Sequence, residues 1–250
     1  MWNRSNLLGI LTILSLLFLL NLAGCSTKET TAALEITEQE KIVKSFLQAI
    51  NDKDIQKAEA LLGPNMVYLE EYSDGTQDKF DNWKDIQGIL TEIMDDNTRL
   101  TVDEFQPMNS TTLVAQGKAS DYVTETVGLT KALRYTSKYT FQEGKISSME
   151  FQRNKVDEEL LIQKTKGTIG VALTDKDGKI FIEECLDGKS AQQAGLKVGD
   201  RIEAVDGQRI SEMKYGIKES IYRIRGEVGT QVKLTINRDG KDFDVNIIRM

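Results

Sequence analysis

Hydrophobic residues between positions 36 and 98 recur mainly at helical spacing. Ile42, Phe46 and Ile50 lie four residues apart, behind a capping box formed by Thr37-Glu38-Gln39-Glu40. This combination predicts an amphipathic helix whose apolar side faces a core. A second apolar stripe, from Phe80 to Ile93, predicts another helix of the same kind.

Between these two helices the pattern predicts a short helix and a strand. Asp54 can cap a helix that runs to Leu62 and stops at Gly63-Pro64, and Met66 to Tyr72 favour a strand. From residue 99 to residue 153 the hydrophobic spacing changes to two, with a turn at Glu143-Gly144, which predicts four strands. The predicted order is therefore helix, helix, strand, helix and four strands.

This order, over residues 36–153 and with the segment Asn51 to Leu62 after the opening helix, resembles the NTF2-like (SnoaL-like) superfamily. The resemblance implies a cone in which a curved antiparallel sheet wraps a long helix and leaves an open pocket. Members of the superfamily include ketosteroid-isomerase-like enzymes as well as non-catalytic cups and association modules. No catalytic motif in this sequence selects between these possibilities.

An acid or base in such a cup requires a desolvated carboxylate beside hydrogen-bond donors. Glu70 or Asp121 are the candidate carboxylates, with Tyr68, Tyr122 or Tyr139 as candidate donors. The alternative is that the tyrosines are ordinary strand residues and the carboxylates are surface charges.

The C-terminal part of the chain carries more specific motifs. Residues 154–166 are rich in charge and predict a linker that can include a short helix. Residues 167–250 then predict short strands and two helices, with turns at Asp177-Gly178 and Asp239-Gly240. Between Ser190 and Arg238 the motifs A-G-L, G-D-x-I, D-G and R-G-x-x-G-T follow one another. This string resembles the PDZ module of the C-terminal processing peptidases, and it implies a partly open β-barrel with two helices.

The PDZ resemblance implies a peptide-binding site built from a loop and a helix. The loop amides would hold a terminal carboxylate, Lys166 would add positive potential, and the peptide would add a strand beside the loop. The predicted loop residues are Thr168, Ile169, Gly170 and Val171, and the predicted helix residues are Ile217, Ile221 and Ile224. The alternative for these isoleucines is a place in the core. We expect partners to be protein or peptide C-termini with apolar end residues.

The first 35 residues predict export. Leu7 to Leu20 form an uncharged run behind Arg4, too short for a membrane span of about 20 residues but suited to a secretion signal. The following Leu22-Ala23-Gly24-Cys25 resembles a bacterial lipobox, which implies cleavage before Cys25 and acylation of that residue, palmitate included. Residues 1–24 are then a lipoprotein signal peptide and residues 25–35 a tether, on the extracytoplasmic face of the cell membrane. The alternatives are an uncleaved anchor or a simple signal peptide.

Composition narrows the chemistry. The formal net charge is −7 with no basic stripe, which argues against nucleic-acid binding. There is no His, and Cys185 is the second of two cysteines, so His- or Cys-based catalysis and metal sites are not expected. We expect no cofactor and no metal.

Because no Ser/Lys protease domain follows the PDZ-like segment in this sequence, we expect a non-enzymatic protein. The predicted function is a membrane-anchored lipoprotein that binds peptides or protein C-termini as an adaptor. The alternative is a small-molecule-binding or ketosteroid-isomerase-like enzyme that uses the NTF2-like cup, with the PDZ domain for recruitment.

Overall fold

The structure is a computed structural model that describes residues 36–129 and 131–250. The predicted signal peptide, the Cys25 lipidation site and the tether lie outside these residues and stay predictions. No helix in the described part of the chain is long and apolar enough to cross a membrane.

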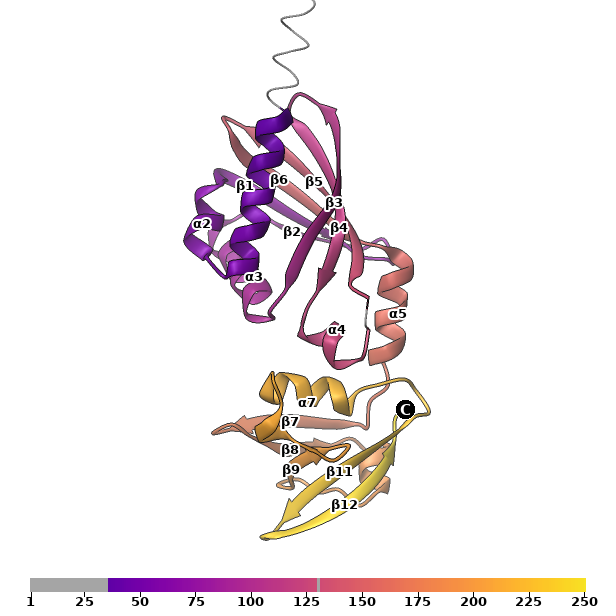
Figure 1. Cartoon of the computed structure of the whole chain (residues 1–250). Helices are drawn as coiled ribbons and strands as arrows, with labels where there is room; N and C mark the ends of the chain where they lie inside the picture. Colours follow the sequence, from indigo (N-terminus) through magenta and orange to yellow (C-terminus); the bar gives the residue numbers. More distant parts are fainter. Residues whose placement is uncertain (1–35, 130) are drawn as a thin grey trace, which may run out of the picture.

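The described chain forms an N-terminal unit and a C-terminal unit, each built on a six-stranded sheet. Figure 1 shows the two units stacked end to end and joined by α5. The class is α+β, as predicted. The predicted linker falls on α5, and the domain limits at residues 153 and 167 stay predictions.

The N-terminal unit begins with a helix over residues 36–52. Its further elements are α2 (Ile55–Ala60), β1 (Leu62–Glu71), β2 (Gln77–Phe80), α3 (Trp83–Asp95), β3 (Arg99–Asn109), β4 (Thr112–Ser120), α4 (Tyr122–Thr126), β5 (Leu133–Gln142), β6 (Lys145–Arg153) and α5 (Lys155–Thr165). The strand order is β2-β1-β6-β5-β4-β3. Among the described strands of this sheet, neighbours pair antiparallel except β1 and β6, which run parallel.

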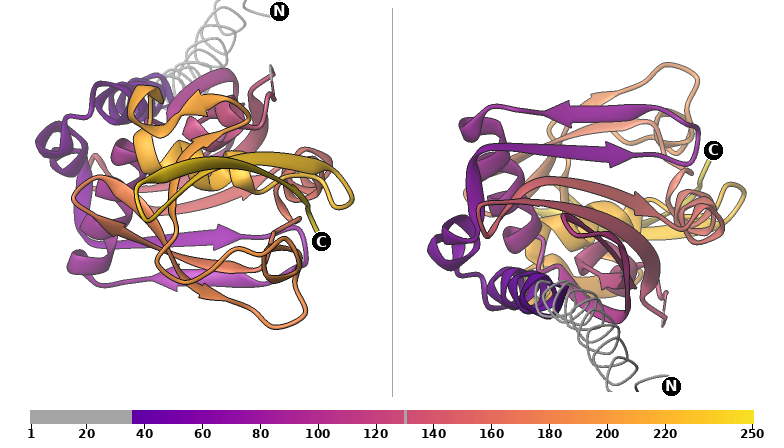
Figure 2. Two further views of the ribbon diagram at one scale, coloured as in Figure 1. Left: turned by 90° about the horizontal axis from the view of Figure 1, so that it is seen from below. Right: turned by 90° about the horizontal axis from the view of Figure 1, so that it is seen from above.

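The sheet curves around the first helix and α3, as Figures 1 and 2 show. These helices and the inner side of the sheet share one hydrophobic core, which includes Phe46, Ile50, Leu90, Leu113 and Tyr139. The long helix wrapped by a curved sheet confirms the predicted cone.

Two predicted boundaries in this unit are wrong, and two elements were not predicted. The predicted second helix ends at Ala60, because the chain enters β1 at Leu62 and carries Gly63-Pro64 into that strand. Phe80 belongs to β2 rather than to the third helix, which is capped by Asn82 through a hydrogen bond to the Asp85 N–H at 3.0 Å. The hairpin strand β2 and the short helix α4 were not predicted.

The C-terminal unit places its strands in the order β12-β11-β9-β8-β7, with β10 paired to β9. Its elements are β7 (Val171–Lys176), β8 (Lys179–Cys185), α6 (Ser190–Gln193), β9 (Arg201–Val205), β10 (Gln208–Arg209), a 3-10 turn (Ile210–Glu212), α7 (Gly216–Ile224), β11 (Gln231–Arg238) and β12 (Lys241–Ile248). Helix α6 begins at Ser190, with Lys189 as its N-cap. Because β7 and β12 end the described sheet, it is an open structure with an edge at β7.

Candidate peptide-binding site and the cup

The loop that precedes β7 is held at its N-terminal end by backbone hydrogen bonds. Gly167 exchanges two bonds with Gly226, at 2.8 and 3.1 Å, and Thr168 exchanges two with Met250, at 3.1 and 2.8 Å. A Cβ on Gly167 would lie 2.6 Å from the Gly226 carbonyl oxygen, so this approach requires glycine. The R-G-x-x-G-T motif therefore anchors the loop.

The loop leaves its amides available. The Ile169 carbonyl accepts from Ala191 N and the Gly170 carbonyl accepts from Leu186 N, both at 2.9 Å. Within the described residues, the N–H groups of Ile169 and Gly170 donate no hydrogen bond. Gly170 has φ +77°, a left-handed conformation that favours glycine. Successive free amides at such a bend form an anion-binding nest.

Next to the loop, β7 is the edge of the described sheet. An edge strand has one row of backbone groups without a neighbouring strand, and an extended peptide can pair with it. Val171, Leu173 and Ile217 pack against the same core cluster, which brings β7 and α7 to one side of the unit. Figure 1 shows α7 lying over this side of the sheet.

The predicted site residues divide into two groups. Thr168 is exposed, and Val171, Ile217 and Ile221 are half-buried, so their side chains can meet a ligand. Ile169 and Ile224 are instead 1% and 3% exposed within the core cluster. For the side chains of Ile169 and Ile224 the core alternative therefore holds, and Ile169 can offer a ligand its backbone N–H rather than its side chain.

The G-D-x-I motif has a structural role. Asp200 is 1% exposed and forms two bonds of 2.7 Å with the Arg238 guanidinium. It also accepts from the Lys197 N–H at 2.8 Å. Burial raises the pKa of Asp200, but these hydrogen bonds outweigh it and hold the pKa below its usual value. The carboxylate thus ties the turn before β9 to β11.

The N-terminal unit contains a cavity of about 400 Å³ on the inner side of its curved sheet. Most of its lining is apolar, and Tyr68, Glu70, Tyr139 and Arg153 contribute polar groups. Burial raises the pKa of Glu70, and the Tyr68 hydroxyl lies 3.5 Å from Glu70 Oε2. The structure therefore brings Glu70 into contact with Tyr68 and places Tyr139, a second predicted donor, in the lining of the same cavity.

The other predicted cup residues have different surroundings. Asp121 also lines the cavity, but its carboxylate caps α4 by accepting from Thr124 N at 2.8 Å. The Tyr122 ring lies 5.9 Å from the Tyr215 ring and 5.6 Å from the Tyr222 ring, centroid to centroid. Tyr122, the first residue of α4, therefore belongs to the contact between the units, where its ring meets Tyr222 of α7 and Tyr215 just before that helix.

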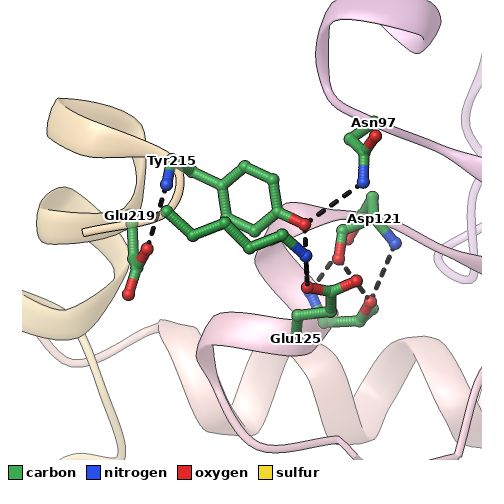
Figure 3. A network of polar contacts seen from close by, with 7 residues as sticks. Asn97, Asp121, Glu125, Tyr215 and Glu219 are labelled. Carbon is green, nitrogen blue, oxygen red and sulfur yellow. Dashed lines mark hydrogen bonds and ion pairs between the residues drawn. The ribbon is translucent and has the colours of Figure 1, made fainter. Parts of the chain in front are cut away.

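Polar contacts complete the junction between the units (Figure 3). The Tyr215 hydroxyl donates to Glu125 at 2.8 Å and accepts from the Asn97 side chain at 3.2 Å. Lys214 bonds the same Glu125 oxygen at 2.9 Å. Hydrogen bonds from Lys214 and Tyr215 lower the pKa of Glu125. Helix α7 and the residues before it thus rest on α4 and the turn after α3.

No group of three or more potential metal-ligating side chains occurs in the part of the chain that the structure describes.

Comparison with known proteins identifies the C-terminal unit. Residues 167–248 match the family model of the PDZ domain. A curated relative, "Carboxy-terminal processing protease CtpA" of Bacillus subtilis, is 35% identical over 102 residues, which are 40% of this chain and 21% of the relative. "Carboxy-terminal-processing protease" of Bartonella bacilliformis is 35% identical over 85 residues, which are 33% of this chain and 19% of that protein. The chain thus spans about a fifth of the length of these relatives.

The chain is also similar to solved structures at low identity. One is an NTF2-like protein of unknown function from Cytophaga hutchinsonii, with 12% identity and a TM-score of 0.36, covering 46% of this chain and 88% of that one.

These findings confirm the PDZ prediction and contradict another. The prediction of a non-enzymatic protein is wrong by this comparison, since the relatives matched over the PDZ region are named proteases. That prediction rests on the absence of a recognisable protease domain in this sequence. Such an absence does not establish that the protein lacks activity.

Proposed function

We propose that this protein binds the C-termini of polypeptides along β7, with the terminal carboxylate at the amides of Ile169 and Gly170. The observation that carries the proposal is the pair of free N–H groups beside an unpaired strand edge. PDZ domains bind extended peptides by strand addition, in which main-chain bonds give affinity and alternate pockets give specificity.

The half-buried side chains indicate which peptides fit. Ile217 and Ile221 present aliphatic surface on α7, so apolar residues should be preferred at the last and third-last positions of the peptide. A short peptide loses conformational freedom on docking, so we expect affinity on the order of micromolar, or about 8 kcal/mol.

Peptide titration tests this proposal. Peptides ending in Val, Leu or Ala are compared as free acids and as C-terminal amides by calorimetry. The acids should bind and the amides should bind much more weakly; equal affinity would exclude a carboxylate site. Ile221→Asp should abolish most binding, since it places a charge beside the incoming carboxylate. Ile248→Asp is the matched control, because Ile248 is exposed on β12 at the opposite edge of the sheet.

We propose that this peptide binding serves proteolytic processing, because the relatives that match the same residues are named proteases. A bound peptide is incubated with the protein and an extract of the cell envelope and followed by mass spectrometry. Cleavage of the peptide that occurs with wild type and is lost with Ile221→Asp supports the assignment. A peptide that stays intact throughout counts against it.

Attachment to the extracytoplasmic face of the membrane through Cys25 is part of the proposal. It is supported by the apolar run and the lipobox-like sequence. A lipid anchor would concentrate the binding site near envelope proteins.

A second candidate function rests on the cup. An apolar cavity of about 400 Å³ with a desolvated Glu70 beside Tyr68 suits a small apolar molecule with one hydrogen-bonding group. Thermal-shift screening of such compounds against wild type and Glu70→Gln tests it. A stabilising compound whose effect does not change in the variant would exclude a role for Glu70.

A further inference from the structure

A lysine from a distant loop lies against the carboxylate nest. A Cβ placed on Gly170 would be 2.2 Å from Lys189 Cβ, 2.6 Å from its Cγ and 3.5 Å from its Cδ. The aliphatic stem of Lys189 therefore covers Gly170 directly. Lys189 lies just before α6 and is exposed to solvent.

Backbone hydrogen bonds fix this arrangement. Leu186 N donates to the Gly170 carbonyl and Ala191 N donates to the Ile169 carbonyl, each at 2.9 Å. These two bonds lie on either side of Lys189 in the sequence, and Lys189 N itself bonds the Leu186 carbonyl at 3.2 Å. The backbone of Lys189 is thus held beside the loop whose amides are free.

The charge of Lys189 is available to a ligand. Over residues 36–129 and 131–250, no carboxylate forms a salt bridge with its ammonium group. The ammonium nitrogen is two bonds beyond Cδ, so the side chain can extend from Gly170 toward an anion held by the loop amides, and opposite charges attract.

We propose that Lys189 is the cation that selects the terminal carboxylate of the bound peptide. This inference rests on the proposed peptide-binding function and adds a specificity-determining residue to that site. Lys166, the cation expected from the sequence, caps α5, with its N–H bonded to the Ile162 carbonyl at 2.9 Å. The three atoms nearest to a Cβ on Gly170 all belong to Lys189, not to Lys166.

The expected effect of Lys189 on peptide affinity follows from the solvent exposure of its side chain. A solvent-exposed ion pair changes an equilibrium constant by roughly two- to fivefold, and the amides of the nest supply the remaining affinity. The contribution should fall at high salt, because the Debye length shrinks to about 3 Å at 1 M ionic strength.

The test uses Lys189→Met in the full chain, since methionine keeps the stem over Gly170 and removes the charge. Affinities for one Val-ending peptide and its amide are measured at low salt and at about 0.5 M NaCl. Lys189→Met should weaken the acid about threefold, leave the amide unchanged and abolish most of the salt dependence. Lys189→Arg should retain wild-type behaviour, and Lys166→Met is the matched control that should do so as well.

The outcomes separate the two proposals. If wild type does not prefer acid over amide, the carboxylate site itself is wrong, and this inference fails with it. If wild type prefers the acid and Lys189→Met keeps the same preference and salt dependence, only the role of Lys189 is wrong. If Lys189→Met weakens acid and amide equally while Lys189→Arg restores both, the side chain shapes the loop, and selection by charge is overturned.

Discussion

The buried pair between Asp200 and Arg238 should be the main polar determinant of PDZ stability, and Asp200→Asn tests it. Asparagine keeps the shape of the side chain and can still accept from the Lys197 N–H. It loses the charge that faces Arg238, whose guanidinium bonds both carboxylate oxygens at 2.7 Å. The substitution therefore removes the ion pair with little change in packing.

The expected loss of stability follows from burial. Breaking a fully buried ion pair costs about 3 to 5 kcal/mol. Asp200 is 1% exposed, but the Arg238 side chain is 29% exposed and can be rehydrated, so we expect about 2 to 3 kcal/mol. With a urea m-value of about 1.5 kcal/mol/M, the midpoint should fall by about 1.3 to 2 M.

Amide hydrogen exchange in β9 and β11, measured at increasing urea concentrations, reports the unfolding of the PDZ unit separately from that of the N-terminal unit. Asp244→Asn is the matched control, because Asp244 also pairs with a cation, Lys233, but both side chains are 49% exposed. It should change the midpoint little. A loss for Asp200→Asn no larger than that of the control would refute the reasoning from burial.

The pH dependence of the stability difference between wild type and Asp200→Asn is an independent check on the role of the carboxylate charge. The pKa of Asp200 is lower in the folded state than in the unfolded state, so its stabilisation is present above the unfolded pKa and is lost as pH falls through the folded one. The difference between wild type and Asp200→Asn should therefore shrink below about pH 4. A difference that stays constant down to that range would contradict the assigned cause.

Three further changes are predicted. Arg249→Met removes the guanidinium that bonds the last carbonyl groups of α7, so exchange protection at the end of α7 should fall, with a loss of about 2 to 3 kcal/mol; unchanged protection would contradict this. A double-mutant cycle of Lys218 and Asp96, whose side chains are 51% and 26% exposed, should give a coupling below about 1 kcal/mol, and a larger value would show that the junction is more rigid than its exposure indicates. Cys25→Ala should abolish acylation and detergent partitioning in cells; identical masses and partitioning of variant and wild type would refute the lipoprotein prediction.

The sequence predicted elements where one signal dominated. The four-residue spacing from Ile42 to Ile50 and the period of two in β11 mark long elements with one buried side. Two short elements, β2 and α4, were not predicted. β2 is exposed along most of its length, and α4 has five residues behind the Asp121 cap, so neither carries a periodic apolar signal.

Site residues were predictable only as far as the backbone determines them. The loop around Gly170 could be located by its motif, but the direction of the Ile169 side chain depends on how the loop lies over the core. Lys189 could not be found from sequence spacing. It is brought to Gly170 by backbone hydrogen bonds from the segment that follows β8, and no local pattern encodes that meeting.

Helix α7 borders both candidate sites, because two neighbouring faces of this helix meet them. Ile217 and Ile221 lie on the side expected to meet a peptide, and Lys218, one residue after Ile217 and so about 100° around the helix, bonds Asp96 at 2.6 Å. Asp96 also lines the cup. Helix α7 also contacts α4 through the Tyr222 and Tyr122 rings, whose centroids lie 5.6 Å apart, so a peptide that displaces α7 should also shift its contacts with α4. Peptide binding should therefore alter hydrogen exchange in α4, and unaltered exchange there would show that the two sites act independently.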